Sequence, residues 1–162
     1  MLANLKIAPK LLLMLAIPVL AMFYFAGQHL STNLQEMRSL QESSALASLA
    51  TVESAVIHEL QKERGLSAGF LGSKGEKFKN ELSGQREKTD AVCKKRMAFL
   101  ETSKGRINAV TKQLESSIAA AQGLSAVRSE VDGLKVEAAQ AITVYTKMIT
   151  ADMDLISAVV ST

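Results

Sequence analysis

The sequence predicts an all-α protein in which an N-terminal transmembrane helix continues into an antiparallel helical bundle. An apolar run without a charged residue, residues 11–27, lies near the start of the chain. Beyond it, hydrophobic residues recur at spacings of three and four, the period of a helix with one buried face. The 162 residues are 48% hydrophobic but only 4% aromatic, a composition that suits long packed helices and not a β-sandwich.

The run LLLMLAIPVLAMFYFAG predicts a transmembrane anchor over residues 11–29. At about 1.5 Å per residue it reaches roughly 25 Å, and the residues before it can extend the span toward the ~30 Å hydrocarbon core. Lys6 and Lys10 precede the run, so residues 1–10 are expected in the cytoplasm. A cleaved signal peptide is the alternative, although no clear A-x-A site precedes Gln28. In either case the remainder is expected in the periplasm, outside the inner (cytoplasmic) membrane.

Residues 30–162 are predicted to form the helical domain outside the membrane. No Pro or Gly interrupts residues 28–64, so the anchor and the next helix are expected to form one helix up to about Leu71. The turn GSKG at 72–75 then allows a second helix to return against the first. Further breaks, which separate shorter helices, are expected at residues 101–105, 122–123 and 132–133.

Charge and isolated reactive residues argue against several classes of function. The net charge is +3 and the chain beyond its N-terminal lysines is close to neutral, so nucleic-acid binding is not expected. Cys93 is the single cysteine, and His29 and His58 are isolated, so neither a disulfide nor a metal site is predicted. The sequence contains no nucleophile–base pair and no cofactor motif, so we expect neither catalytic residues nor a cofactor.

The stretch IHELQKERGLSAGFLGSKG, residues 57–75, contains the candidate binding residue. At about 100° per residue, Arg64 falls inside the apolar stripe of this helix and not at its edge. The stripe consists of Ile57, Leu60, Arg64, Ser67, Ala68 and Leu71, and the adjoining flank, where a neighbouring backbone could approach closely, carries Gly65, Gly69 and Gly72. A guanidinium cannot be deprotonated and is costly to bury unpaired, so Arg64 is expected to hold an anion.

The return helix offers a second cation. If GSKG joins two antiparallel helices, Arg64 lies level with about Ser83, and Gln85, Arg86 and Thr89 lie within about one turn of that level. Two cations without a matching carboxylate would leave room for a small oxyanion, which planar guanidinium groups bind in bidentate fashion.

Three pieces of the sequence resemble the nitrate- and nitrite-sensing domain, the NIT domain: LQKERGLSAGFLGS at 60–73, QREKTD at 85–90 and VYTKMI at 144–149. The L-Q-x-E-R-G-x-S core is fairly specific, and the other two pieces are weak by themselves. The resemblance covers about residues 50–160. NIT domains are all-helical ligand-binding modules of bacterial receptors, such as methyl-accepting chemotaxis proteins and histidine kinases, and of antiterminators.

This resemblance implies that Arg64 is a nitrate or nitrite ligand, and we expect Ser67 and Arg86 to line the same site. The family pattern also has a second half, in which a later E-R-A-like motif supplies another arginine, and nothing after Tyr145 matches it. The chain is therefore expected to be a receptor truncated within its sensor, with an incomplete anion site and its output domain missing.

Two functions follow as hypotheses. The first is a periplasmic sensor of a bacterial transmembrane receptor, a homodimer that binds nitrate, nitrite or a similar oxyanion and signals through its anchor helix. The alternative is a helical dimerisation or partner-binding module without a small ligand. In that case Arg64 would pair with a carboxylate of the chain, such as Glu63, Glu81 or Glu87, or would extend to the surface.

Overall fold

The computed structural model describes residues 7–162, with side chains from Met14 onward except that of Ile17. Within these residues the chain contains helices and no strand, which confirms the all-α class. The predicted basic residue Lys6 lies outside the described residues. The helices are α1 (Ile7–Gly72), α2 (Lys79–Thr102), η2 (Asn108–Val110), α3 (Thr111–Ala121), α4 (Leu124–Asp132) and α5 (Ala138–Val160).

The long helix α1 runs without interruption through the predicted anchor and ends at the predicted turn. Near its N-terminus it is long and apolar enough to cross a membrane, by length and composition. Pro18 lies inside this part of the helix, as membrane-spanning helices tolerate. The described chain divides into two compact units, and the first of them ends at Gln41.

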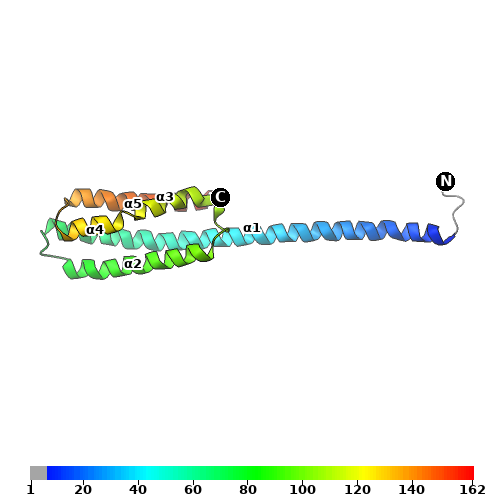
Figure 1. Cartoon of the computed structure of the whole chain (residues 1–162), viewed down its shortest axis with the longest axis horizontal. Coiled ribbons are helices and arrows are strands. Elements are labelled where there is room, and N and C mark those ends of the chain that lie inside the picture. Colours follow the sequence, from blue (N-terminus) through cyan, green and yellow to red (C-terminus); the bar gives the residue numbers. More distant parts are fainter. Residues whose placement is uncertain (1–6) are drawn as a thin grey trace. The chain divides into compact units, whose positions relative to one another are not determined.

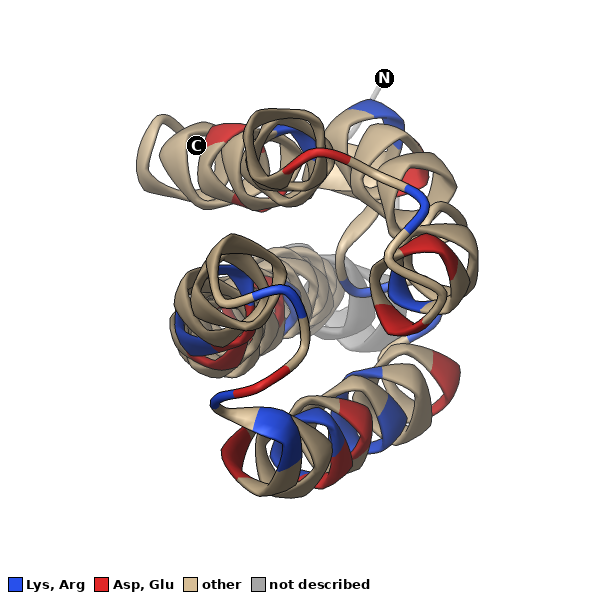
Figure 2. Cartoon of the chain, turned by 90° about the vertical axis from the view of Figure 1, so that its left-hand side faces the viewer, with Lys and Arg blue, Asp and Glu red and all other residues tan. Residues whose placement is uncertain are grey.

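The second unit, Glu42–Thr162, is a helical bundle. The C-terminal part of α1 packs with α2, α5 and a column in which α3 and α4 follow each other (Figure 1). Viewed along the helices, the helices of the bundle surround a common centre (Figure 2). Basic and acidic residues are interspersed along these helices. The breaks between the helices lie where the sequence predicts them.

Buried ion pairs define the register of α1 against α2. Glu53 pairs with Arg96, and Glu63 lies near Arg86, so residue numbers on the two helices run in opposite directions. This register places Arg64 level with about Gln85, close to the predicted level of Ser83.

The core of the bundle consists of two apolar clusters. The larger is built from α1, α2, α4 and α5, and its buried members are Val56, Leu60, Phe70, Leu82, Val127, Val131, Ala141, Tyr145, Met148 and Ile149. The smaller contains Ala45, Leu49, Ile107, Val110 and Leu155. Burial of these apolar side chains supplies the main driving force for packing the helices together.

The buried face of α1 differs from the predicted one by one residue position. Glu63 is 0% exposed, whereas Arg64 is only half-buried and lies at the edge of the stripe. The predicted close approach of a backbone to the glycine flank is also wrong. A Cβ on Gly65 or Gly72 would meet no atom within 4 Å, and one on Gly69 would meet the ring of Phe78.

Candidate functional site

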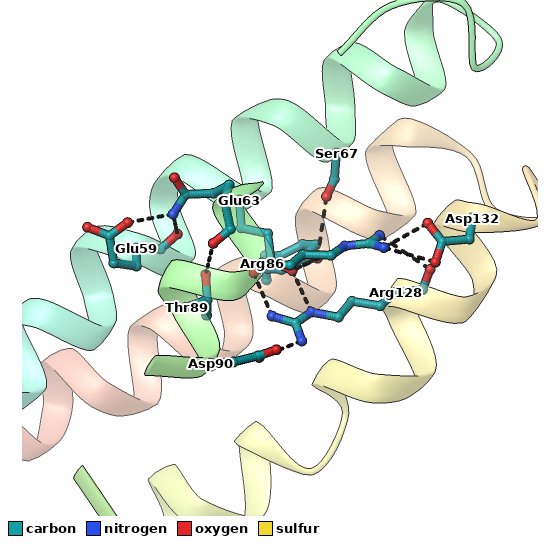
Figure 3. A network of polar contacts seen from close by, with 10 residues as sticks. Glu59, Glu63, Ser67, Arg86, Thr89, Asp90, Arg128 and Asp132 are labelled. Atoms are coloured by element: carbon teal, nitrogen blue, oxygen red, sulfur yellow. Dashed lines mark hydrogen bonds and ion pairs between the residues drawn. The ribbon is translucent and has the colours of Figure 1, made fainter. Parts of the chain in front are cut away.

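A polar network around Glu63 crosses the larger apolar cluster (Figure 3). Arg128 on α4 donates to both carboxylate oxygens of Glu63, from Nε at 2.7 Å and from Nη2 at 2.8 Å. The Tyr145 hydroxyl on α5 donates to Glu63 Oε1 at 2.8 Å. A buried carboxylate is stable only with such partners, so Glu63 ties α1 to α4 and α5.

The partners of Glu63 set its charge. Burial raises the pKa of the Glu63 carboxyl. Hydrogen bonds from Arg128, Thr89 and Tyr145 and the charge of Arg128 together lower it by more than burial raises it, so the pKa lies below its ordinary value. Burial and the adjacent Glu63 charge raise the pKa of Tyr145. Glu63 is therefore ionised and Tyr145 is a neutral hydrogen-bond donor at neutral pH.

Both arginines of this network also bind exposed carboxylates. Arg128 Nη1 donates to Asp90 at 2.7 Å. Arg86 Nη1 donates to the two oxygens of Asp132 at 2.8 and 2.9 Å, and its Nε lies 3.8 Å from Glu63 Oε1. Arg86 is therefore directed toward α4 and is neutralised by acidic side chains of the chain itself.

Ser67 lies one turn beyond Glu63 on α1 and is 0% exposed. Its hydroxyl donates to the Tyr145 hydroxyl at 3.3 Å, so it extends the Glu63 network toward the end of α1 (Figure 3). The sequence places Ser67 on the buried face correctly, and the structure gives it a partner on α5.

Arg64 has different surroundings from the other arginines of the network. Its Nη1 donates to the hydroxyl of Thr146 on α5 at 3.0 Å. No ion pair joins it to a carboxylate among the side chains that the structure describes, and Glu63, one of its predicted alternative partners, is held by Arg128. The structure therefore brings Arg64 and Ser67 to neighbouring positions of α5, Thr146 and Tyr145, whereas Arg86 faces α4.

A cavity of about 580 Å³ opens beside Arg86 at the loop end of the bundle. Its charged lining consists of Lys74, Lys79, Arg86 and Asp132, and Phe70, Leu82 and Leu134 are among its apolar lining residues. Three cations face one carboxylate there, so the cavity carries an excess of positive charge.

Sequence reasoning missed Arg128, the principal partner of Glu63. No short spacing in the sequence relates Arg128 to Glu63, because the two residues are 65 positions apart. Tyr145 belongs to the VYTKMI segment, but its periodicity predicts only packing. The sequence signal for this network is Glu63 itself, which the sequence predicts only as an alternative partner of Arg64 because it lies outside the apolar stripe.

The sequence profile for nitrate and nitrite sensing, NIT, matches residues 55–162. The chain belongs to the NIT family. This confirms the family predicted from the motif that contains Arg64. Membership of the NIT family indicates a sensory role directed at nitrate or nitrite.

The solved structure of the NasR transcription antiterminator is similar to this chain, with a TM-score of 0.72 and 23% sequence identity. The similarity covers 86% of this chain and 37% of that chain, so the NIT-family protein described here spans little more than a third of the NasR structure. At this identity the similarity shows the shared fold. No curated protein matches the chain.

Proposed function

We propose that the chain is the sensory region of a bacterial transmembrane signalling receptor, such as a chemoreceptor, and that it binds nitrate, nitrite or a similar small oxyanion. Membership of the NIT family supports the ligand class. The apolar N-terminal part of α1 supports an anchor in the inner membrane, with the bundle in the periplasm. The similarity to the NasR antiterminator says nothing about which signalling domain this sensor would control. The proposal that the chain belongs to a membrane receptor therefore depends on the apolar part of α1.

The state of Arg64 is the observation that carries the proposal. The residue is half-buried, and its guanidinium donates to a neutral hydroxyl in a solvent-exposed contact and has no carboxylate partner among the described side chains. A guanidinium without a carboxylate partner is available to an oxyanion, because its planar donors match the anion in bidentate geometry. The anion would occupy the side of Arg64 next to Thr146, between α1 and α5.

Ser67 and Arg86 are proposed as further ligands, and each must exchange a present bond to reach the anion. Ser67 would release the hydroxyl of Tyr145. Arg86 would release Asp132, whose side chain is 58% exposed and can be rehydrated at little cost. Binding at all three residues would therefore change the contacts of α1 and α2 with α4 and α5.

The signal would leave through α1. Arg64 and the apolar N-terminal stretch belong to this one helix. An anion that binds one packing of the bundle more tightly than another shifts the equilibrium between them by that difference in affinity. We expect the receptor to act as a homodimer, in which such a shift changes the contacts between the two α1 helices.

The alternative is a dimerisation or partner-binding module without a small ligand. It requires Arg64 to be neutralised by a carboxylate or fully solvated. Arg64 is half-buried and no such ion pair is present among the described residues, and this favours an anion as its partner.

Calorimetry with the whole 162-residue chain in detergent micelles tests the proposal. Nitrate should bind the wild-type protein, and Arg64→Ala should weaken binding by about 10- to 100-fold, the value of charged hydrogen bonds of about 1.5–3 kcal/mol. Arg106→Ala is the matched control, because this arginine is exposed and its guanidinium donates only to the Thr102 carbonyl among the described residues. Unchanged nitrate affinity in Arg64→Ala, or no nitrate binding by the wild-type protein, contradicts the proposal.

A further inference from the structure

A second polar cluster crosses the bundle between the two apolar clusters. On α1, Glu53 falls between Leu49 of the smaller cluster and Val56 of the larger one. Each of four helices contributes one side chain, and none is more than 4% exposed. The members are Glu53 on α1, Arg96 on α2, Ser117 on α3 and Asp152 on α5.

The donors of this cluster are directed mainly at Asp152. Arg96 Nη1 lies 3.4 Å from Asp152 Oδ1, Arg96 Nη2 donates to Ser117 Oγ at 2.6 Å, and the Ser117 hydroxyl donates to Asp152. Arg96 Nε lies 3.1 Å from Glu53 Oε1 without hydrogen-bond geometry. Both carboxylate oxygens of Glu53 are buried and receive no hydrogen bond from the described residues.

The charges of the cluster do not balance if both acids are ionised. Two carboxylates would then share one guanidinium, leaving a net negative charge between two apolar clusters. A buried carboxylate without donors takes up a proton in preference to remaining charged. Asp152 has donors from Ser117 and Arg96, so Glu53 is the group that takes the proton.

The surroundings of Glu53 favour its protonated form on balance. Burial raises the pKa of Glu53 to about 7, with the Arg96 charge opposing and the Asp152 charge adding to this effect. On α2, burial raises the pKa of the Cys93 thiol, one turn from Arg96, so this thiol adds no charge at neutral pH. The α3 residue in the cluster, Ser117, is uncharged, and α5 contributes Asp152, whose pKa is also raised by burial.

We propose that Glu53 is a proton-binding site of the bundle and that release of its proton loosens the packing of α1 against α2 and α5. The ionised carboxylate would have to be hydrated or would have to move away from Asp152, and either change opens the layer between the two apolar clusters. The bundle would then respond to proton concentration as well as to a bound anion. The proposal does not depend on the anion site at Arg64.

The direction of the pH effect follows from the position of the proton. The pKa of Glu53 in the folded protein is about 7, above its ordinary value of 4.5. The stability that proton binding contributes is therefore fully present below pH 4.5 and is lost as the pH rises through about 7.

Carbon-13 NMR of the glutamate side-chain carboxyls, on the whole 162-residue chain in micelles, measures this proton directly. One glutamate should titrate with a midpoint near 7. The signal should be absent from Glu53→Gln, and in Asp152→Asn its midpoint should move downward, because the neighbouring negative charge is gone. The proposal is overturned if every glutamate titrates below about 5, or if the high midpoint persists in Glu53→Gln.

Thermal unfolding between pH 4 and pH 8 provides the second readout. Glu53→Gln should unfold at the same temperature as the wild-type protein at pH 4 and at a higher temperature at pH 8, because glutamine stays uncharged. Glu115→Gln is the control, since Glu115 is exposed on α3 and its substitution should give no pH-dependent difference. A pH-independent difference for Glu53→Gln contradicts the proposal, and if this variant does not fold, the wild-type carboxyl titration decides.

Discussion

Single arginines in this bundle have two kinds of partner. Arg86, Arg96 and Arg128 each contact a buried glutamate and an aspartate, so their charges are compensated by the chain. Arg64 contacts the neutral hydroxyl of Thr146. The first three arginines hold helices together in this structure, and Arg64 is the one among these four without a carboxylate partner, so it is free for a ligand without giving up an ion pair.

Replacing Arg128 with methionine tests the structural role of the first group. Arg128→Met keeps the apolar stem but leaves the buried carboxylate of Glu63 without its bidentate partner, so we expect a loss of about 3 kcal/mol of stability at pH 7. Chemical unfolding of the whole 162-residue chain in micelles measures this loss. Arg106→Met, at an exposed site, should change stability by less than about 0.5 kcal/mol.

The same substitution has a pH signature. The pKa of Glu63 is lowered in the folded protein, so the stability it contributes is present above its ordinary pKa of 4.5 and is lost as the pH falls through the lowered value. The difference between wild-type and Arg128→Met proteins should therefore shrink in strong acid. A difference that is equally large at pH 7 and pH 2 would show that lost packing, and not the ion pair, accounts for the effect.

The error of one position on α1 shows what periodicity can predict about single residues. Counting apolar residues excluded Glu63 from the buried face, and Arg64 was included because it completed the apolar spacing. The burial of Glu63 depends on Arg128 and Tyr145, which reach it from distant parts of the chain. A charged residue is buried by its partners, so its position cannot be assigned from the local pattern alone.

Individual helices end by a shared arrangement at the loop end of the bundle. After α1, Gly75 N–H donates to Phe70 O and Lys74 N–H to Leu71 O, both at 2.9 Å, the hydrogen bonds of a Schellman motif. After α4, Leu134 and Lys135 form the corresponding bonds. Both motifs place a residue other than glycine in the left-handed region, Lys74 with a φ of 54° and Leu134 with a φ of 50°.

Lys74→Gly should stabilise the bundle by about 1 kcal/mol, because glycine adopts the left-handed conformation without the Cβ penalty. Lys77→Gly is the matched control, since Lys77 is exposed in the same loop and is not among the residues with positive φ. Thermal unfolding should show a higher midpoint for Lys74→Gly and no increase for Lys77→Gly. Equal effects of the two substitutions would assign the change to the unfolded chain.

The helices and their boundaries could be predicted because the signals are local. Gly72, the QG pair before Leu124 and Gly133 mark the ends of helices in both sequence and structure. The antiparallel return of α2 follows from a short turn. The grouping of Arg64 with Arg86 could not be tested by such signals, since the direction of Arg86 depends on Asp132 in α4.

Across the whole chain, α1 belongs to both compact units. Large apolar side chains of its N-terminal part are exposed, among them Leu20, Phe23 and Phe25. A hydrocarbon environment would cover these side chains, as expected for a membrane anchor. The proposed receptor therefore requires that this part of α1 insert into a bilayer.

Val19→Arg tests that requirement. An arginine near the centre of a membrane-spanning helix costs about 2.5–3.5 kcal/mol, so the variant should be partly released from membranes by alkaline carbonate, whereas the wild-type protein should remain in the pellet. Leu40→Arg is the control, because Leu40 is 70% exposed but lies beyond the apolar run. Release of the wild-type protein would contradict an uncleaved anchor.

A crystal structure of the protein grown with nitrate tests the central claim most directly. We expect planar, trigonal electron density within about 3 Å of the Arg64 guanidinium, in bidentate contact with its nitrogens. Thr146 should then no longer be the sole partner of Arg64. Nitrate bound elsewhere, or an Arg64 side chain that still contacts only Thr146 in crystals saturated with nitrate, would contradict the account.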